Sequence, residues 1–340
     1  MEKIKSNCIV PNASFSVPKS LIKQYDRLNR KAPEVGDLIF GEVAEMGHHR
    51  SIESRSARHH TVNIGTRAIF VFGNRYAPDQ YEGLVPSEFQ DYIELFSRGG
   101  VVGAVQNQFI GRTTRVRVLG YACKDDGLVI NTRDHVLLKP KQQSREKPGA
   151  KLILCVGTSM NSGKTEAAAA CCYALSSMGR QVRSAKITGT ASLKDPLLMN
   201  DCGAEHIADF TYFSYPSTYL LEREQLLRMF NDFDMKYGNS PKNYLVIEFA
   251  DSIFQRETAM LLKSPEVCKR ISKLIFCTPD STAVFGGLRI LKEEFDLEAD
   301  AISGLCSSSP LAMREIQSFT DLPIIQRMEK DIRKILSIIG

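Results

Sequence analysis

The sequence predicts an α/β protein in which a C-terminal, doubly wound and mostly parallel sheet follows a small β-rich barrel or sandwich. Three observations predict this arrangement. Short apolar segments separated by glycines and by Asn or Asp clusters fill 36–138, which is typical of antiparallel strands. A charged, proline-bounded linker is expected at 139–150, and apolar strands alternate with helices over 151–340. Residues 1–35 are expected to form an arm with one helical stretch near 20–29.

The individual elements follow from local patterns. In the β-rich part, the predicted strands are 37–46, 61–64, 67–72, 101–105, 114–119 and 128–131. In the C-terminal part, the predicted strands are 152–156, 181–187, 244–249, 274–278, 299–304 and 323–326. The predicted helices are 166–178, part of 201–209, 222–236, 255–263, 283–294, 310–319 and 329–338.

The composition indicates a cytoplasmic, globular protein. The chain is 43% hydrophobic and 24% charged, and it has no long apolar run, so we expect no membrane partner. The first 20 residues have no sustained apolar segment, so a secretory signal is not expected, and the nine cysteines include no Cys-x-x-Cys pair, which indicates reduced thiols. The net charge is +5, but no basic stripe with interleaved aromatic residues is present, so nucleic acid is not an expected partner.

The segment 151–170, KLILCVGTSMNSGKTEAAAA, has the pattern of a phosphate-binding loop. An apolar strand leads into a glycine-bracketed turn, and an Ala-rich helix follows Gly-Lys-Thr. Glycines let backbone N–H groups approach phosphate oxygens, and the helix start adds partial positive charge. Five residues, rather than four, separate the first glycine from Gly-Lys. The residues predicted to bind the nucleotide are Gly157, Thr158, Asn161, Ser162, Gly163, Lys164, Thr165 and Glu166.

Polar residues at the carboxyl ends of the neighbouring strands are candidates for chemistry, because ligands of such sheets bind there. Lys164 is predicted to reach the β- and γ-phosphates, and Lys186 to hold an acceptor molecule. Glu248 is the first choice as a Mg²⁺ ligand or general base. The predicted Mg²⁺ ligands are Thr165, Glu248, Asp251 and Asp195. No guanine-reading Asn-Lys-x-Asp segment follows the later strands, which favours adenine.

Two polar segments of the β-rich part have no assigned role. Residues 47–53 and 58–60 together contain four of the six histidines, and they could form either a metal site or a polar loop. The segment 73–80, GNRYAPDQ, follows an apolar strand. It could line a pocket through Arg75, Tyr76 and Asp79, or it could be a structural turn.

The loop GTSMNSGKT at 157–165 resembles the G-T-x-x-x-x-G-K-T loop of dethiobiotin synthetases, including the extra residue. The segment from Lys186 to Gly189 is similar to the substrate-side K-P-x-x-x-G segment of that family. Glu248 falls where the family has the Glu of V-E-G-A-G-G, although the glycines after it are absent here. The family belongs to a P-loop class with signal-recognition and MinD-like ATPases. The resemblance covers about 150–330 and implies an ATP- and Mg²⁺-dependent enzyme that forms a homodimer.

Two further resemblances add alternatives for the function of the chain. Lys186 to Gly189, followed by Asp201 to Ala204, resembles molybdopterin-guanine-dinucleotide adaptor proteins. The loop also resembles the P-loop half of D-glutamate N-acetyltransferase-type proteins, where it is thought to serve an acyl-CoA. Three functions are therefore expected alternatives: phosphoryl transfer to, or ligation of, a small carboxylate or amine with ATP; CoA-dependent acyl transfer; and nucleotide-switched binding of a partner.

Overall fold

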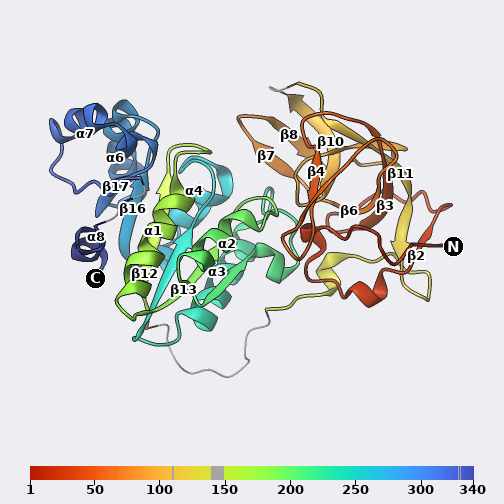
Figure 1. Cartoon of the computed structure of the whole chain (residues 1–340), viewed down its shortest axis with the longest axis horizontal. Helices are drawn as coiled ribbons and strands as arrows, with labels where there is room; N and C mark the ends of the chain where they lie inside the picture. Colours follow the sequence, from red (N-terminus) through yellow and green to blue (C-terminus); the bar gives the residue numbers. More distant parts are fainter. Residues whose placement is uncertain (109–110, 139–148, 328, 330) are drawn as a thin grey trace. The chain divides into compact units, whose positions relative to one another are not determined.

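The computed structural model describes all residues except 109–110, 139–148, 328 and 330 (Figure 1). The chain forms two compact units. The N-terminal unit contains Met1–Lys139 together with Gly189–Lys194 and Phe210–Leu220, and the C-terminal unit contains Pro140–Thr188, Asp195–Asp209 and Leu221–Gly340. Two loops of the C-terminal half therefore belong to the N-terminal unit. Most of the predicted linker, 139–148, lies outside the described residues.

The N-terminal unit is built on a mixed sheet of short strands. Its described strands are β1 Glu2–Lys3, β2 Gln24–Asp26, β3 Leu38–Glu45, β4 Ser51–Glu53, β5 His59–Thr61, β6 Arg67–Phe72, β7 Arg75–Ala77, β8 Tyr81–Leu84, β9 Tyr92–Leu95, β10 Val101–Gln108 and β11 Thr114–Cys123. Strands β4 and β5 pair separately as a hairpin. Single-turn 3₁₀-helices lie at Asn12–Ser14, Lys19–Leu21 and Thr132–Asp134.

The pairings of five of these strands run in a closed ring. Strand β11 pairs with β3, β3 with β6, β6 with β10, β10 with β9, and β9 again with β11. Only the pair of β6 and β10 in this ring is parallel. Closure leaves each of the five strands with partners on both sides, and apolar side chains fill the interior. The core includes Ile39, Val43, Phe70, Ile93, Val102, Val116 and Tyr121.

Several predictions for this unit need correction. The helix expected near 20–29 is wrong, because Gln24–Asp26 pairs with β11 and buries Tyr25. The strand expected at 61–64 is wrong in position, since β5 ends at Thr61. Residues 128–131 make isolated bridges rather than a strand. At Gln24–Asp26, pairing with β11 has overridden a weak local helical preference. The predicted strands 37–46, 67–72, 101–105 and 114–119 are confirmed within a few residues.

The C-terminal unit contains a parallel six-stranded sheet in the order β14-β13-β15-β12-β16-β17. Its strands are β12 Lys151–Gly157, β13 Gln181–Lys186, β14 His206–Asp209, β15 Asn243–Glu248, β16 Ile271–Cys277 and β17 Ala301–Ser303. Its described helices are α1 Lys164–Ser177, α2 Lys194–Asp201, α3 Arg223–Tyr237, α4 Arg256–Leu262, α5 Pro265–Cys268, α6 Ser281–Phe295, α7 Pro310–Gln317 and α8 Ile332–Ile339. The class is therefore α/β, as predicted.

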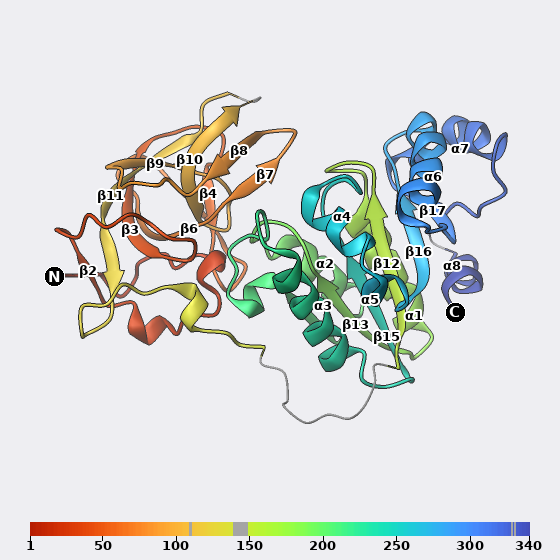
Figure 2. The ribbon, with the colours of Figure 1, turned by 180° about the vertical axis from the view of Figure 1, so that it is seen from behind.

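Helices cover both faces of this sheet. The small side chains of α1 and the apolar face of α8 pack on one face, against alternate residues of the central strands such as Ile153 and Val246. Figure 2, seen from the other side, shows α3, α4 and α5 over the opposite face. Burial on both faces explains why the central strands are continuous apolar runs. Within the described residues, every helix is too short or too polar to span a membrane.

Two predictions for this unit are wrong. The helix expected within 201–209 is replaced by the edge strand β14, and α2 precedes it. Residue Pro196 sits in the first turn of α2, where a missing N–H costs little. The strand expected at 323–326 is reduced to one bridge between Ile302 and Ile324. The other five predicted strands and the remaining helices are present, with ends shifted by a few residues.

Candidate functional site

The glycine-bracketed loop joins the central strand β12 to α1, at the carboxyl edge of the sheet. Gly157 must lack a side chain, because a Cβ there would lie 2.4 Å from Ser162 Oγ and 2.5 Å from the Cys277 carbonyl oxygen. Gly163 has φ 95°, and Asn161 has φ 62°. Gly163 is the N-cap of α1 and offers no side-chain cap. The N–H groups of the first helical turn are therefore left for a ligand.

A second loop, which begins at Gly304, packs against the loop 157–165. Gly304 has φ 100°, and a Cβ on it would lie 2.2 Å from the Ser162 carbonyl oxygen. That carbonyl accepts a hydrogen bond from the Leu305 N–H at 3.2 Å. The backbones of the two loops thus approach too closely for any side chain between them. This packing fixes the curvature of the loop before any ligand binds.

Lys164 is buried inside this loop. Its side chain is 5% exposed, and its Nζ donates to the Ser159 carbonyl oxygen at 2.7 Å. Burial lowers the pKa of Lys164, although Glu248 and Asp251 act in the opposite direction. The Nζ also donates to Ser162 Oγ at 3.4 Å, so the ammonium group is held at the loop by two neutral oxygen atoms and by nearby carboxylates. A polyphosphate would be a stronger partner for this charge than these neutral oxygen atoms.

Lys186 and Glu248 face each other because β13 and β15 are neighbours in register at these two residues. The Lys186 Nζ lies 3.3 Å from Glu248 Oε1 and also forms an ion pair with Asp195. Burial lowers the pKa of Lys186, but Asp195 and Glu248 outweigh burial and the net direction is upward. Burial raises the pKa of Glu248, and Lys186 only partly offsets this. The structure therefore brings together three of the predicted site residues in one cluster, in which Glu248 is buried and Lys186 and Asp195 are partly exposed.

The remaining predicted ligands lie at the edge of this cluster. The Thr165 hydroxyl favours the ionised form of the Glu248 carboxylate and so lowers its pKa, against the larger effect of burial. Asp251, three residues beyond β15, has φ 60° and acts electrostatically on both Lys164 and Lys186.

Glu166 is engaged elsewhere. Its carboxylate forms a bidentate ion pair with Arg327. The Arg327 Nη2 lies 2.8 Å from Glu166 Oε1, and the Arg327 Nε donates to the other oxygen. The Arg327 N–H donates to Ser307 Oγ, so the pair links the start of α1 to the loop behind it. Sequence reasoning did not single out Arg327, because it is 161 residues from its partner.

Two buried oxygen atoms in this region have no hydrogen-bond partner among the described atoms, namely Glu248 Oε2 and Thr158 Oγ1. A buried carboxylate oxygen without a partner is costly, and a metal-bound water or a metal would supply one. The donor set of Thr165 hydroxyl and Glu248 carboxylate suits a hard, oxygen-liking cation. Within the described residues, no group of three or more His, Cys, Asp or Glu side chains has the arrangement of a complete metal site. A cation here would therefore need oxygens from its ligand.

The two unassigned polar segments of the N-terminal unit meet each other. His49 Nε2 lies 2.7 Å from Tyr81 Oη and 2.8 Å from the Phe96 carbonyl oxygen, while Arg75 Nη1 lies 3.3 Å from the same nitrogen. Arg75 also donates to Gln80 Oε1 at 2.9 Å. These contacts tie the turn at 73–80 to the histidine segment. They favour the structural alternative for both segments.

This network predicts acid sensitivity. Burial, with help from Arg75 and His48, lowers the pKa of His49 to about 3, whereas the unfolded chain has the ordinary value of 6.5. The unfolded state therefore binds the extra proton between these values, and stability that is present above pH 6.5 is lost as the pH falls toward 3. The wild-type unfolding free energy should drop by roughly 2 kcal/mol from pH 7 to pH 5 through His49 alone.

Urea unfolding of the full chain at both pH values measures this effect, with His49→Gln as the comparison. The glutamine variant cannot titrate, so its loss on acidification should be smaller by about the same amount. Equal losses in the two proteins would show that another group is responsible.

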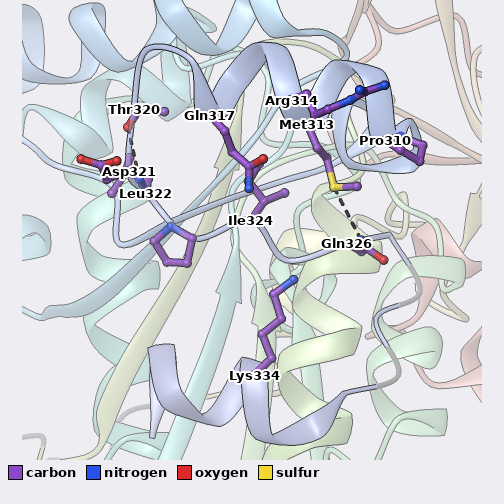
Figure 3. Close-up of a pocket in the computed structure, with 11 residues that line it drawn as sticks. Pro310, Met313, Arg314, Gln317, Thr320, Asp321, Leu322, Ile324, Gln326 and Lys334 are labelled. Atoms are coloured by element: carbon purple, nitrogen blue, oxygen red, sulfur yellow. Dashed lines mark hydrogen bonds between the residues drawn. The ribbon is translucent and has the colours of Figure 1, made fainter.

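A groove of about 650 Å³ lies elsewhere, between α7 and α8. Figure 3 shows Gln317 and Lys334 directed into it from opposite sides, with the buried Ile324 between them. Lys334 also pairs with Glu329 at 3.1 Å. None of the predicted nucleotide or Mg²⁺ ligands lines this groove. It is therefore separate from the loop 157–165.

No protein-family model and no curated protein matches the sequence. Among solved structures, the chain is similar to a ParA family ATPase from Chlorobium tepidum TLS, with 16% identity, a TM-score of 0.36, and coverage of 57% of this chain and 90% of that one. A second similarity is to the signal recognition particle receptor FtsY from Elizabethkingia anophelis in complex with GDP, with 10% identity, a TM-score of 0.39, and coverage of 62% and 69%.

A third similarity is to a nucleotide-binding protein from Archaeoglobus fulgidus in complex with ADP, with 13% identity, a TM-score of 0.33, and coverage of 55% of this chain and 85% of that one.

Proposed function

We propose that the C-terminal unit binds ATP with Mg²⁺ and uses it to transfer a phosphoryl group to, or to ligate, a small carboxylate or amine. The observation that carries this proposal is the buried Lys164 ammonium at the mouth of an uncapped helix, beside a buried Glu248 carboxylate. A loop that leaves N–H groups and a lysine for phosphates, next to an acid for a cation, suits a nucleoside triphosphate.

Each residue has a proposed role. Lys164 would exchange the Ser159 carbonyl for phosphate oxygens, and the first N–H groups of α1 would contact the same phosphates. Thr165 and Glu248 would hold Mg²⁺, with Asp251 as a further candidate. Mg²⁺, when bound, would neutralise phosphate charge. The acceptor role predicted for Lys186 stays a prediction. Because the Lys186 ammonium already forms ion pairs with two carboxylates, we propose that Lys186 orients Glu248 and Asp195.

The charges of the cluster bear on how nucleotide binding should depend on Mg²⁺. Two ammonium groups, Lys164 and Lys186, face three carboxylates, those of Asp195, Glu248 and Asp251. The cluster therefore carries one net negative charge when all five groups are ionised. A free nucleotide polyphosphate would be repelled by these carboxylates, and a divalent cation would remove the repulsion. Nucleotide binding should therefore depend strongly on Mg²⁺.

A thermal-shift experiment on the full chain tests the function class. ATP with Mg²⁺ should raise the melting temperature, because a ligand at 100 times its dissociation constant adds about 2.7 kcal/mol of stability. ATP with EDTA should raise it much less. If acetyl-CoA shifts the melting temperature without Mg²⁺ and ATP does not, the acyltransferase alternative replaces this proposal.

Measurements of ATP turnover distinguish the proposed enzyme from the alternative of a nucleotide-switched binding module. An enzyme of the proposed kind should release ADP or AMP much faster when its acceptor is supplied, whereas a nucleotide switch hydrolyses slowly and binds a partner in a nucleotide-dependent way. A screen of small carboxylates and amines, followed by ADP and AMP release, identifies the acceptor. Tight Mg²⁺·ATP binding with no stimulated turnover by any acceptor would favour the switch.

A further inference from the structure

The end of β15 and the turn that follows it carry Glu248 and Asp251, the two acidic residues of the proposed Mg²⁺ site. Glu248 ends the strand, Asp251 lies three residues later, and Ala250 stands between them. Asp251 adopts the left-handed backbone region at φ 60°. That conformation is uncommon for a residue other than glycine and costs free energy. The turn therefore needs contacts from outside itself to keep its shape.

Two buried threonines provide these contacts at Ala250. The Ala250 N–H donates to Thr188 Oγ1 at 2.7 Å, and Thr258 Oγ1 donates to the Ala250 carbonyl oxygen at 2.9 Å. Thr188 follows β13 and is 1% exposed, while Thr258 lies in α4 and is fully buried. Both polar groups of one peptide residue are thus satisfied by side chains from two different elements.

The two hydroxyls also contact each other, with 3.4 Å between their oxygen atoms. Each hydroxyl has one proton to donate. Because the Thr258 proton is used on the Ala250 carbonyl, the Thr188 proton is the one that can be donated between the two threonines. The result is a closed ring that runs from the Ala250 N–H to Thr188, from Thr188 to Thr258, and from Thr258 back to the Ala250 carbonyl. Every donor in the ring is used once.

We propose that Thr188 and Thr258 are positioning residues for the Mg²⁺ site. They hold Ala250 so that the carboxylates of Glu248 and Asp251 are directed toward Lys164 and Thr165. Neither threonine needs to touch nucleotide or metal. The inference rests on the proposed function, because its effect is read as Mg²⁺ affinity. It explains how the turn keeps its shape without the glycines that follow the corresponding Glu in dethiobiotin synthetases.

The test is the apparent Mg²⁺ affinity in calorimetric titrations of the full chain with ATP at a series of Mg²⁺ concentrations. Thr258→Val keeps the volume but breaks the ring, and it should weaken Mg²⁺ affinity by about 10-fold or more, as loss of a supporting hydrogen bond does in other metal sites. Thr258→Ser keeps the hydroxyl and should restore wild-type affinity. The residual ATP affinity without Mg²⁺ should not change in either variant.

Ser264→Ala is the matched control, since Ser264 is a buried hydroxyl just beyond α4 that donates to the Met260 carbonyl and lies outside the ring. Its Mg²⁺ affinity should equal that of the wild type. The proposal is overturned if Thr258→Val matches the wild type, or if Thr258→Ser or Ser264→Ala loses as much as Thr258→Val.

If Thr258→Val fails to fold, amide hydrogen exchange of the wild-type chain tests the threonine ring instead. The ring predicts that the Ala250 amide is protected, and rapid exchange at Ala250 in a folded protein would contradict it. A wild-type chain that binds no Mg²⁺·ATP contradicts the proposed function instead. The exchange measurement would then decide on the ring alone.

Discussion

Replacing Lys164 by alanine is expected to weaken Mg²⁺·ATP binding by about 100-fold or more. The lysine is the buried cation of the loop, and a charge-assisted hydrogen bond to phosphate contributes about 1.5–3 kcal/mol, where 1.4 kcal/mol is tenfold in affinity. More than one phosphate oxygen would lose its partner. Isothermal titration calorimetry of the wild type and the variant measures the difference.

The same variant should fold at least as stably as the wild type. Burial lowers the pKa of Lys164, which means that the folded state disfavours its charge. Lys151→Ala is the control, because Lys151 is the first residue of β12, the strand that leads into the loop, and lies at the end away from the loop. It should bind Mg²⁺·ATP like the wild type. An unchanged affinity in Lys164→Ala, or an equal loss in Lys151→Ala, contradicts the assignment of the loop.

Replacing Glu248 by glutamine is expected to reduce ATP turnover on the order of 100-fold, in the range seen when one electrostatic group of an active site is removed. The amide keeps the size of the side chain, but it loses the charge that a Mg²⁺ ligand or a general base requires. Steady-state ADP or AMP release at saturating Mg²⁺·ATP measures the effect. Asp300→Asn, which changes an acid paired with Lys273 at the opposite edge of the sheet, should leave turnover unchanged.

Stability provides an independent check on Glu248→Gln. Burial raises the pKa of this carboxyl, so ionised Glu248 costs stability at neutral pH, and that cost grows as the pH rises through the folded-state pKa. The neutral glutamine should therefore raise the melting temperature at pH 7 while it lowers turnover. A variant that lost both stability and turnover would indicate a structural role for Glu248 in its ion pair with Lys186.

The sequence predicts well those features that depend on neighbouring residues. The strand at 151–157, the loop and α1 follow from an apolar run, glycines and alanines within twenty residues. The succession of a β-rich part and an α/β part along the chain also follows from local sequence patterns. In contrast, β2 and β14 are too short to show a period, and their strand conformation comes from pairing with β11 and β13.

The candidate site could be predicted only in part, for the same reason. The residue types at the strand ends mark Lys186 and Glu248, but their pairing depends on the register of two strands far apart in the chain. The threonine ring joins the ends of β13 and β15 to α4 through a main-chain group, so no side-chain pattern reveals it. Similarly, the inclusion of 189–194 in the N-terminal unit is a property of tertiary packing.

The most direct test is a crystal structure of the full chain with Mg²⁺ and a non-hydrolysable ATP analogue. We expect the β- and γ-phosphates within the loop 157–165, with Lys164 Nζ moved from the Ser159 carbonyl onto phosphate oxygens and Mg²⁺ held between Thr165 and the phosphates. An analogue bound away from this loop, with Lys164 still on Ser159, would contradict the account.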